Sequence, residues 1–344
     1  MKVVIMAGGK GARFWPKSTD SKPKQFLNLV SSDETMLQQS YRRYRKYLEP
    51  EDVYVLTCSG YAAAVRKQLP ELESDRLIIE PAQRDTGPCV ALMAHYFLCR
   101  HLDEVLVTVP SDQYMADEAD LHDVLLTAEQ AARSEGVVVT LGIVPTRPET
   151  GYGYIRTEYG MSGLQPVVSF IEKPTKTKAE ALIRQPNVYW NSGIFVWRPS
   201  TIASYMKLYR PEIWQAVDVP EEQLRDTYAS LHKISVDYAI IEKVEKLLMI
   251  PISFHWDDVG SWRSLERIFP ADDQGNVIRG DVYGEDIRNC IIHAEKRNVV
   301  VIGAENLIVV STDEGVLVCH KSAEQHIKHA VQWIADKRGD RQSP

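Results

Sequence analysis

Short runs of apolar residues alternate with longer amphipathic segments along roughly the first 250 residues. The apolar runs predict buried strands at 3–8, 53–57, 77–80, 105–110 and 137–142. The segments between them carry apolar residues at helical spacing, which predicts helices near 36–47, 61–69, 87–101 and 118–134. Uninterrupted apolar strands separated by helices are typical of parallel sheets that are covered on both faces. The pattern therefore predicts an α/β fold with helices on both faces of its sheet.

The pattern changes at about residue 151 and again after Pro270. Between these points, strands are expected at 151–157, 167–174 and 192–199, and helices near 176–184, 199–209, 221–232 and 236–246. Beyond Pro270, short runs of valine and isoleucine recur without a long helix until one near 322–337. We therefore expect a large domain over 1–268 and a small β domain, closed by a terminal helix, over 269–344.

The composition narrows the class of protein. Hydrophobic residues make up 44% and charged residues 25% of the chain, as in ordinary soluble domains. The net charge of -7 argues against a nucleic-acid partner, but a few local cations could still hold an anionic small substrate. The five cysteines form no CxxC pair, which favours reduced thiols in a cytoplasmic protein. No apolar run approaches the roughly 18 residues of a membrane span, so no membrane partner is expected.

A glycine-rich segment, AGGKGARFWP at 7–16, follows the first predicted strand. It is not a Walker A loop, and Phe14 stands where the dinucleotide fingerprint requires its third glycine. Backbone N–H groups in a glycine-rich turn can still form an anion-binding nest, which Arg13 and Lys24 would strengthen. The alternative interpretation is a solvated turn with ordinary surface cations.

Glu80 ends the strand at 77–80 and opens the segment EPAQRDTGP. An ionised carboxylate only accepts hydrogen bonds, so Glu80 could take both the N1–H and the 2-amino group of guanine. Uracil or thymine would offer it one donor, and adenine offers none at N1. The segment also suits the N-terminal cap of the following helix, through Asp85 or Thr86. The two interpretations can hold together.

Two further carboxylates follow apolar runs. Asp112 comes after Ser111 at the end of one predicted strand, and Asp258 lies in the distant segment HWDDVGSW. The two could hold one hard cation through oxygen, with water and phosphate filling its other positions. For Asp112, a helix N-cap is an equally common role.

Three later segments, PETGYGY, SFIEKP and WNSGIF, place polar side chains beside tight turns or strand ends. These side chains are Glu149, Tyr152, Glu172, Lys173 and Asn191. Hydroxyl-binding carboxylates and amides together with one lysine suit a phosphorylated sugar. Taken singly, each of these residues is more often structural than functional.

In order, these segments resemble the bacterial mannose-1-phosphate guanylyltransferases (GDP-mannose pyrophosphorylases) of the sugar nucleotidyltransferase family. The resemblance spans residues 1–268 and rests on AGGKGARFWPKS, PKQF, EPAQRDTGP, VPSDQ, PETGYGYI, FIEKP, WNSGIF, SVDYAIIEK and WDDVGSW. The chain departs from the family pattern at Ala12, Phe14, Asp85, Gly87, Gln113 and Asp257. Long family members carry a fused isomerase domain for which this chain is too short, so the resemblance implies a single activity.

The resemblance implies a Rossmann-like nucleotide-diphospho-sugar transferase sheet, followed by a β domain that can be a left-handed β-helix used for homodimerisation. It also implies a role for each matched residue. The nucleotide would contact Ala7, Gly8, Gly9, Gly11, Glu80, Thr86 and Ser111. The catalytic cations would be Arg13 and Lys24 on the triphosphate and Lys173 on the sugar phosphate. The sugar would contact Tyr152, Gly153, Glu172 and Asn191, and Mg2+ would be held by Asp112 and Asp258.

The expected reaction is therefore transfer of GMP from GTP to mannose 1-phosphate. Alternatives are an enzyme of the same fold for glucose or heptose 1-phosphate, a non-catalytic nucleotide-sugar sensor and, on weaker grounds, a nicotinamide oxidoreductase. The sensor would be expected to lack Arg13, Lys24 or the two aspartates, and the oxidoreductase would need the missing third glycine.

Overall fold

The computed structural model describes residues 1–9, 11–158 and 163–340, and at Ala12 and 338–340 it describes the backbone only. Lys10 and the Ala12 side chain, where the family pattern has threonine, therefore lie outside the described residues. The chain forms two compact units. Unit 1 comprises Met1–Gly8, Ser40–Ser111 and Met115–Trp256, and unit 2 comprises Gly9–Gln39, Asp112–Tyr114 and Asp257–Pro344. These units group segments that lie far apart along the chain, and the domain boundary at 268/269 stays a prediction.

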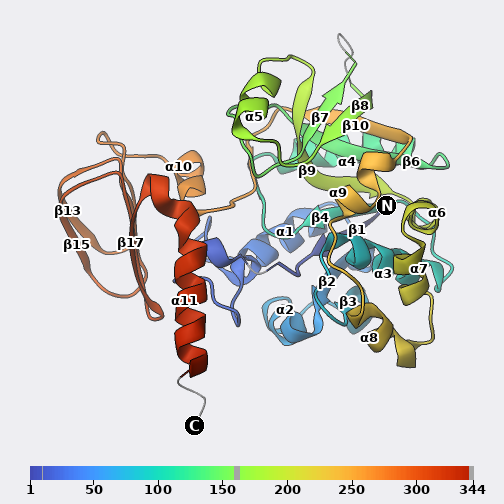
Figure 1. The fold of residues 1–344 in the computed structure, drawn as a ribbon, viewed down its shortest axis with the longest axis horizontal. Coiled ribbons are helices and arrows are strands. Elements are labelled where there is room, and N and C mark those ends of the chain that lie inside the picture. Colours follow the sequence, from blue (N-terminus) through green and yellow to red (C-terminus); the bar gives the residue numbers. More distant parts are fainter. Residues whose placement is uncertain (10, 159–162, 341–344) are drawn as a thin grey trace. The chain divides into compact units, whose positions relative to one another are not determined.

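Unit 1 is built around a nine-stranded sheet (Figure 1). Its strands are β1 (Lys2–Met6), β2 (Val53–Cys58), β3 (Leu77–Glu80), β4 (Leu106–Pro110), β6 (Val137–Ile143), β7 (Tyr154–Thr157), β8 (Gln165–Ile171), β9 (Val188–Trp197) and β10 (Lys246–Ile252). They run in the order β3-β2-β1-β4-β9-β6-β10-β8-β7. The five apolar runs predicted first all form strands of this sheet.

The sheet is mixed, whereas the sequence pattern predicts a parallel one. Strands β3, β2, β1 and β4 are parallel, and β6 is parallel to β10. Strand β9 enters between β4 and β6 and pairs antiparallel with both. Its C-terminal part, Ile194–Trp197, is buried, so its sequence is the apolar run expected of any strand covered on both faces. Such a run does not show whether the strand is parallel or antiparallel to its neighbours.

Helices cover both faces of the sheet, as the pattern predicts. On one face, β1 and β2 contribute Val4, Tyr54 and Leu56 to a core shared with α3 (Thr86–Leu98), α6 (Pro199–Tyr209), α7 (Pro211–Val217), α8 (Glu221–Ala229) and α9 (Val236–Ala239). The alternate residues Val3 and Ile5 are equally buried, and they point to the opposite face because successive strand side chains alternate. Helix α4 (Glu118–Ala132) packs on β6, β9 and β10. Unit 1 also contains α2 (Ala62–Gln68) and α5 (Lys176–Leu182).

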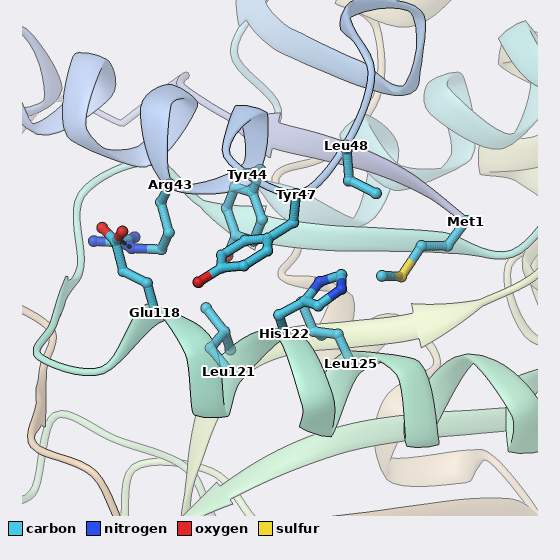
Figure 2. Close-up of a pocket in the computed structure, with 9 residues that line it drawn as sticks. All are labelled: Met1, Arg43, Tyr44, Tyr47, Leu48, Glu118, Leu121, His122 and Leu125. Atoms are coloured by element: carbon cyan, nitrogen blue, oxygen red, sulfur yellow. Dashed lines mark ion pairs between the residues drawn. The ribbon is translucent and has the colours of Figure 1, made fainter.

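Helix α1 (Met36–Arg45) and the turn that follows it pack against α4 (Figure 2). Tyr47 stacks on His122 with ring centroids 4.5 Å apart. Beside this pair, the Glu118 carboxylate lies 3.8 Å from Arg43 and 3.5 Å from Lys46. An aromatic stack beside an ion-pair cluster thus joins the polar edges of two amphipathic helices.

Unit 2 contains a coil of short parallel strands (Figure 1, orange). Strand β12 (Val277–Arg279) pairs with β14 (Ile291–Ala294), which pairs with β16 (Leu307–Thr312), while β13 (Val282–Arg288) pairs with β15 (Val299–Glu305). Strands from alternate positions in the chain therefore stack in two columns, the arrangement of a parallel β-helix. An antiparallel pairing of β16 with β17 (Gly315–His320) ends the coil, and helix α11 (Ile327–Asp340) follows. The left hand of the β-helix stays a prediction.

The coil buries part of the glycine-rich N-terminal segment within unit 2. Phe14 lies in one apolar core with Trp262, with Ile308 of β16 and with Ile327 of α11. The rings of Phe14 and Trp262 meet edge to face at 5.3 Å. The loop after β1 is therefore held by residues of the last third of the chain. Unit 2 also contains α10 (Leu265–Ile268), while β5 (Tyr114–Met115) and β11 (Trp256–Asp257) lie at the unit boundaries.

Candidate functional site

Gly11 shapes the loop that follows β1. It has φ +62, a conformation that L side chains rarely adopt, and a Cβ at this position would lie 2.2 Å from Cβ of Lys24. Gly9, by contrast, has none of the described atoms within 4 Å of a built Cβ. The close approach at Gly11 therefore brings Lys24 against the loop, and only glycine allows it.

Gly11→Ala is expected to destabilise the protein clearly more than Gly9→Ala. The added methyl group at position 11 overlaps Lys24 and forces a strained backbone, whereas position 9 has room for it. Thermal unfolding of the two variants measures the difference. Equal melting temperatures would contradict the close packing of Gly11 on Lys24.

Lys24 joins the two predicted metal-binding segments in unit 2. Its side chain is buried, and its ammonium nitrogen lies 2.8 Å from Oδ2 of Asp112 and donates to the backbone carbonyl of Asp258 at 2.6 Å. Arg13 donates to the carbonyl of Gly260 at 3.5 Å. Its buried Nε has no hydrogen-bond partner among the described residues. Four predicted site residues from distant parts of the sequence therefore gather around one loop.

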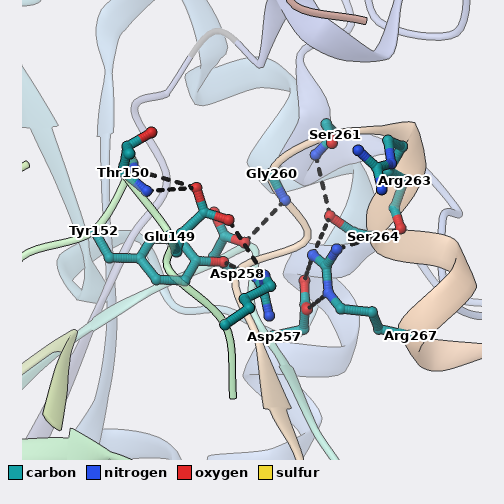
Figure 3. Close-up of polar contacts among 12 residues, drawn as sticks. Glu149, Thr150, Tyr152, Asp257, Asp258, Gly260, Ser261, Arg263, Ser264 and Arg267 are labelled. Atoms are coloured by element: carbon teal, nitrogen blue, oxygen red, sulfur yellow. Dashed lines mark hydrogen bonds and ion pairs between the residues drawn. The ribbon is translucent and has the colours of Figure 1, made fainter. Parts of the chain in front are cut away.

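Polar groups within the loop from Asp257 to Ser264, and Arg267 just beyond it, hold this loop (Figure 3). Asp257, which replaces the usual serine of the family pattern, is buried and accepts hydrogen bonds from Arg267 and, at 2.8 Å, from the backbone N–H of Val259. Oδ1 of Asp258 accepts from the backbone N–H of Gly260 at 3.2 Å. The departure at Asp257 thus has a structural role beside the candidate site.

The same loop is supported by Glu324, a residue that the sequence analysis missed. This buried carboxylate accepts from the Ser261 hydroxyl at 2.9 Å and from the Arg263 backbone N–H at 2.9 Å. Burial raises the pKa of Glu324, and the neighbouring Arg263 and Arg13 charges oppose that rise. No motif marks Glu324, because its partners lie about 60 positions earlier in the chain.

Glu80 lies at the end of β3 in unit 1, as predicted, and is buried there. Its Oε1 accepts from the Tyr228 hydroxyl at 2.7 Å and from the Arg84 backbone N–H at 3.2 Å. Its Oε2 lies 3.7 Å from a Cβ built on Gly8. Gln83, another residue that the sequence analysis missed, donates to the carbonyl of Gly8 at 2.8 Å. The end of β1 and the Glu80 carboxylate therefore lie together.

Other predicted nucleotide contacts in unit 1 have backbone roles. The Ala7 N–H donates to Leu56 at 2.7 Å, and the Ser111 N–H donates to Met6 at 3.2 Å. The Thr86 hydroxyl accepts from the backbone N–H of Val236 at 2.8 Å. Thr86 thus fastens α9 to the start of α3, so a nucleotide role for its hydroxyl stays a prediction.

Local contacts explain why the chain departs from the family pattern at Asp85 and Gly87. Asp85 caps α3 by accepting from the Thr86 N–H at 2.8 Å, which is one of the two alternatives predicted. A Cβ on Gly87 would lie 2.8 Å from the carbonyl oxygen of Ile234. The alanine of the family pattern would not fit there without a shift.

Tyr152, Gly153, Glu172 and Lys173 lie together in unit 1. The Lys173 ammonium lies 2.6 Å from Oε1 of Glu172, and the Lys173 N–H donates to the carbonyl of Tyr152 at 3.2 Å. A Cβ on Gly153 would lie 2.6 Å from Oε2 of Glu172 and 3.0 Å from Cζ of Phe170, so these side chains pack closely on the glycine. Burial lowers the pKa of Lys173, but its bond to Glu172 and nearby negative charges raise it above its usual value. Lys173 therefore remains a cation.

Asn191 belongs to the same part of unit 1. Its N–H donates to the carbonyl of Gly153 at 2.8 Å, and its side-chain amide donates to Oδ1 of Asp237 at 3.1 Å. Asp237 belongs to the segment SVDYAIIEK, in which it was not among the predicted site residues. Burial and the negative charge of Glu172 raise the pKa of Asp237 to about 7.

Asp237→Asn is expected to gain thermal stability over the wild type as the pH rises from about 5 to about 8. The carboxyl has a pKa of 3.8 as its ordinary value and about 7 in the folded chain. Between these values the folded chain binds more protons than the unfolded chain, so wild-type stability falls as the pH rises. Asparagine removes this titration but keeps an oxygen for Asn191. Melting curves of both proteins across this pH range measure the difference in stability. Parallel pH dependences of the two melting temperatures would contradict the prediction.

The comparisons with known proteins assign the chain to a family. A model described as Nucleotidyl transferase matches residues 2–275. The chain belongs to the nucleotidyl transferase family. In this nucleotidyl transferase, a second model, MannoseP isomerase/GMP-like beta-helix domain, matches residues 280–333. The predicted fold class is thereby confirmed.

Relatives extend over nearly all of this nucleotidyl transferase. A mannose-1-phosphate guanylyltransferase of Klebsiella pneumoniae is 36% identical, with 96% of this chain and 73% of that protein covered. The alginate biosynthesis protein AlgA of Pseudomonas putida is 35% identical, with 98% and 72% covered. A crystal structure of mannose-1-phosphate geranyltransferase from Thermus thermophilus has a TM-score of 0.89 and 33% identity, with 97% of this chain and 99% of that chain covered. These likenesses confirm the family resemblance that the motifs predict.

Neither a membrane span nor a dense cluster of metal ligands occurs in the described part of the nucleotidyl transferase. Over the described ranges of the chain, none of its helices combines the length and the apolar character needed to cross a membrane. The same residues contain no group of three or more His, Cys, Asp or Glu side chains that could hold a metal ion.

Proposed function

We propose that this nucleotidyl transferase moves GMP from GTP to mannose 1-phosphate, giving GDP-mannose and pyrophosphate. The observation that carries the proposal is the gathering of Arg13 and Lys24 with Asp112 and Asp258 in unit 2. Cations placed with two carboxylates suit a substrate that combines a polyphosphate with a divalent cation. The names of the relatives, at about 35% identity, support GTP and mannose 1-phosphate as the substrates.

The attacking group is the phosphate of the sugar. It is already an anion near neutral pH, so the reaction needs no general base to activate it. The difficulty lies in bringing two polyanions together, and catalysis rests on positioning and on neutralising their charge. Arg13 and Lys24 hold the triphosphate and draw charge from the departing pyrophosphate, while Lys173 holds the phosphate of the sugar. Tyr152, Gly153, Glu172 and Asn191 bind the sugar.

The donor set of unit 2 fits Mg2+. Mg2+ is commonly held by one or two carboxylates, with water and substrate phosphate as its other ligands. Asp112 and Asp258, on the two segments that Lys24 contacts, would supply such carboxylates. When bound, the cation neutralises phosphate charge. Lys24 contacts both segments, and its ammonium group pairs with the Asp112 carboxylate.

Glu80 selects the base in this proposal. Its buried carboxylate at the end of β3 accepts from the N1–H and 2-amino groups of guanine, beside the backbone of Gly8. Gly9 and Gly11 provide backbone N–H groups for the phosphates. Burial raises the pKa of Glu80, but the hydrogen bonds from Tyr228 and Arg84 favour the ionised form that guanine requires.

We also propose a homodimer in the cytoplasm. The outward face of the β13–β15 pair carries Tyr283, Val300 and Ile302, which are 57%, 63% and 63% exposed. Tyr283 and Val300 are register partners, so their side chains lie side by side. Neighbouring exposed apolar side chains on a sheet suit an interface, here with a second copy of this chain. All five cysteines are free thiols, which agrees with a reducing compartment.

One assay tests the proposed reaction. Pyrophosphate release is measured for each of four NTPs with mannose, glucose and heptose 1-phosphates. We expect the highest kcat/KM for GTP with mannose 1-phosphate. Preference for another sugar would make the chain a nucleotidyl transferase for that sugar phosphate, and no release with any pair would favour a non-catalytic sensor.

A further inference from the structure

The two oxygens of the Glu80 carboxylate differ in their hydrogen bonds to the surrounding protein. Oε1 accepts two hydrogen bonds, from the Tyr228 hydroxyl at 2.7 Å and from the Arg84 backbone N–H at 3.2 Å. An ionised carboxylate oxygen has about two acceptor positions, so these two donors fill Oε1. Oε2 lies beside Gly8, with 3.7 Å between it and a Cβ built on that glycine. The oxygen left for a base is therefore Oε2.

The surrounding structure fixes Tyr228 where its hydroxyl can donate to Oε1 of Glu80. Its side chain is fully buried in the core that α8 shares with α3. The next residue, Ala229, accepts through its carbonyl from the Arg84 guanidinium. The preceding residue, Thr227, donates through its hydroxyl to the carbonyl of Ala216 at 2.7 Å. The end of α8 is thus tied on both sides of Tyr228, whose hydroxyl points to Glu80.

The protonation state of Glu80 decides which base edge it can match. An ionised carboxylate only accepts, which suits N1–H and the 2-amino group of guanine. A protonated carboxyl donates through one oxygen and accepts through the other, which suits N1 and the 6-amino group of adenine. Burial favours the protonated form and raises the pKa of Glu80, and the hydroxyl of Tyr228 opposes that rise.

We propose that Tyr228 is a positioning residue that determines base specificity: its hydroxyl occupies Oε1 of Glu80 and leaves Oε2, as an acceptor, to guanine. This inference rests on the proposed transfer of GMP from GTP. Tyr228 does not contact the reacting phosphates in this scheme, so its effect falls on base selection and not on the chemical step.

After burial, the hydrogen bond from Tyr228 has the largest effect on the pKa of Glu80, and a substitution can remove it. The other charged or titratable neighbours are Arg84 and Asp85 from the loop after β3, Cys58 from β2 and Cys89 from α3. The charge of Asp85 raises the pKa of Glu80 and that of Arg84 lowers it. Burial raises the pKa of both Cys58 and Cys89, so these thiols stay neutral.

The test is Tyr228→Phe, which keeps the buried ring and removes only the hydroxyl. We expect the ratio of kcat/KM for GTP to that for ATP to fall by about 10- to 100-fold, the range for losing a hydrogen bond to a charged group. KM for GTP should rise while kcat changes little. The increase of KM toward acid pH should begin at higher pH than in the wild type, because Glu80 is protonated more easily. Tyr205→Phe is the control, since it loses a comparable 2.9 Å bond to the Gly136 carbonyl.

A second variant guards against a folding defect in the first. Placing 3-fluorotyrosine at position 228 alone makes the phenol a stronger donor and should move the acid limb of KM for GTP to lower pH. If both variants keep the GTP preference and the pH profile of the wild type, this inference is overturned while the proposed function stands. A wild type without preference for GTP would overturn the proposed function, and this inference with it.

Discussion

Lys24→Met is expected to lower kcat by about 10²- to 10³-fold, the usual loss when a charge-stabilising group is removed from an active site. The ammonium group of Lys24 reaches both Asp112 and the Asp258 carbonyl. In the proposed reaction it meets the charge that grows on the departing pyrophosphate. Methionine keeps the length of the buried stem and removes the charge, so the loss should appear in kcat, measured by pyrophosphate release at saturating substrates.

The control for Lys24→Met is Lys22→Met. Lys22 is exposed and lies two positions earlier in the same segment. Its loss should change kcat by less than about twofold, as for most exposed substitutions. Near-normal turnover in a folded Lys24→Met variant would remove Lys24 from the catalytic machinery and leave it a structural link between Asp112 and the 257–264 loop.

Asp112→Asn is expected to remove most of the activity and the dependence of what remains on Mg2+. The carboxylate is the hard, charged oxygen donor that Mg2+ prefers, and an amide oxygen replaces it poorly. The variant also frees Lys24 from its 2.8 Å ion pair with Asp112. Titration of activity with Mg2+, together with calorimetric titration of the protein with Mg2+ and GTP, measures both effects.

Asp117→Asn provides the matched control for Asp112→Asn. Asp117 caps α4 by accepting from the N–H groups of Ala119 and Asp120, each at 3.1 Å, and asparagine caps a helix equally well. This variant should keep the wild-type Mg2+ titration. An unaltered Mg2+ titration in Asp112→Asn would refute the assignment of that residue as a metal ligand.

Local patterns predicted much of the sheet because a buried strand needs only a short apolar run. The runs at 3–8, 77–80 and 105–110 correspond to β1, β3 and β4, and Glu80 stands at a strand end as expected. The pattern could not give the direction of β9, because apolar burial looks the same in either direction. The predicted helix near 236–246 is also interrupted, with α9 ending at Ala239 and β10 beginning at Lys246.

The candidate site depended more on residues that carry no motif. Glu324 holds Ser261 and Arg263, and Tyr228 holds Glu80, across 148 positions of sequence in the second case. Such partners are ordinary glutamate and tyrosine residues on a terminal segment and on a helix. Only the packing of distant segments shows which polar groups they reach.

The sequence by itself determined the family, the alternating strands and helices, and the residue types available for phosphate, base and cation, because motifs and periodicity are local properties of the chain. The tertiary structure decided which of those residues meet. It placed Lys24 between Asp112 and Asp258, made Gly11 indispensable to that approach, and put the glycine-rich loop into one core with β16 and α11. These contacts join residues far apart in sequence, and close packing of side chains, not local propensity, selects them.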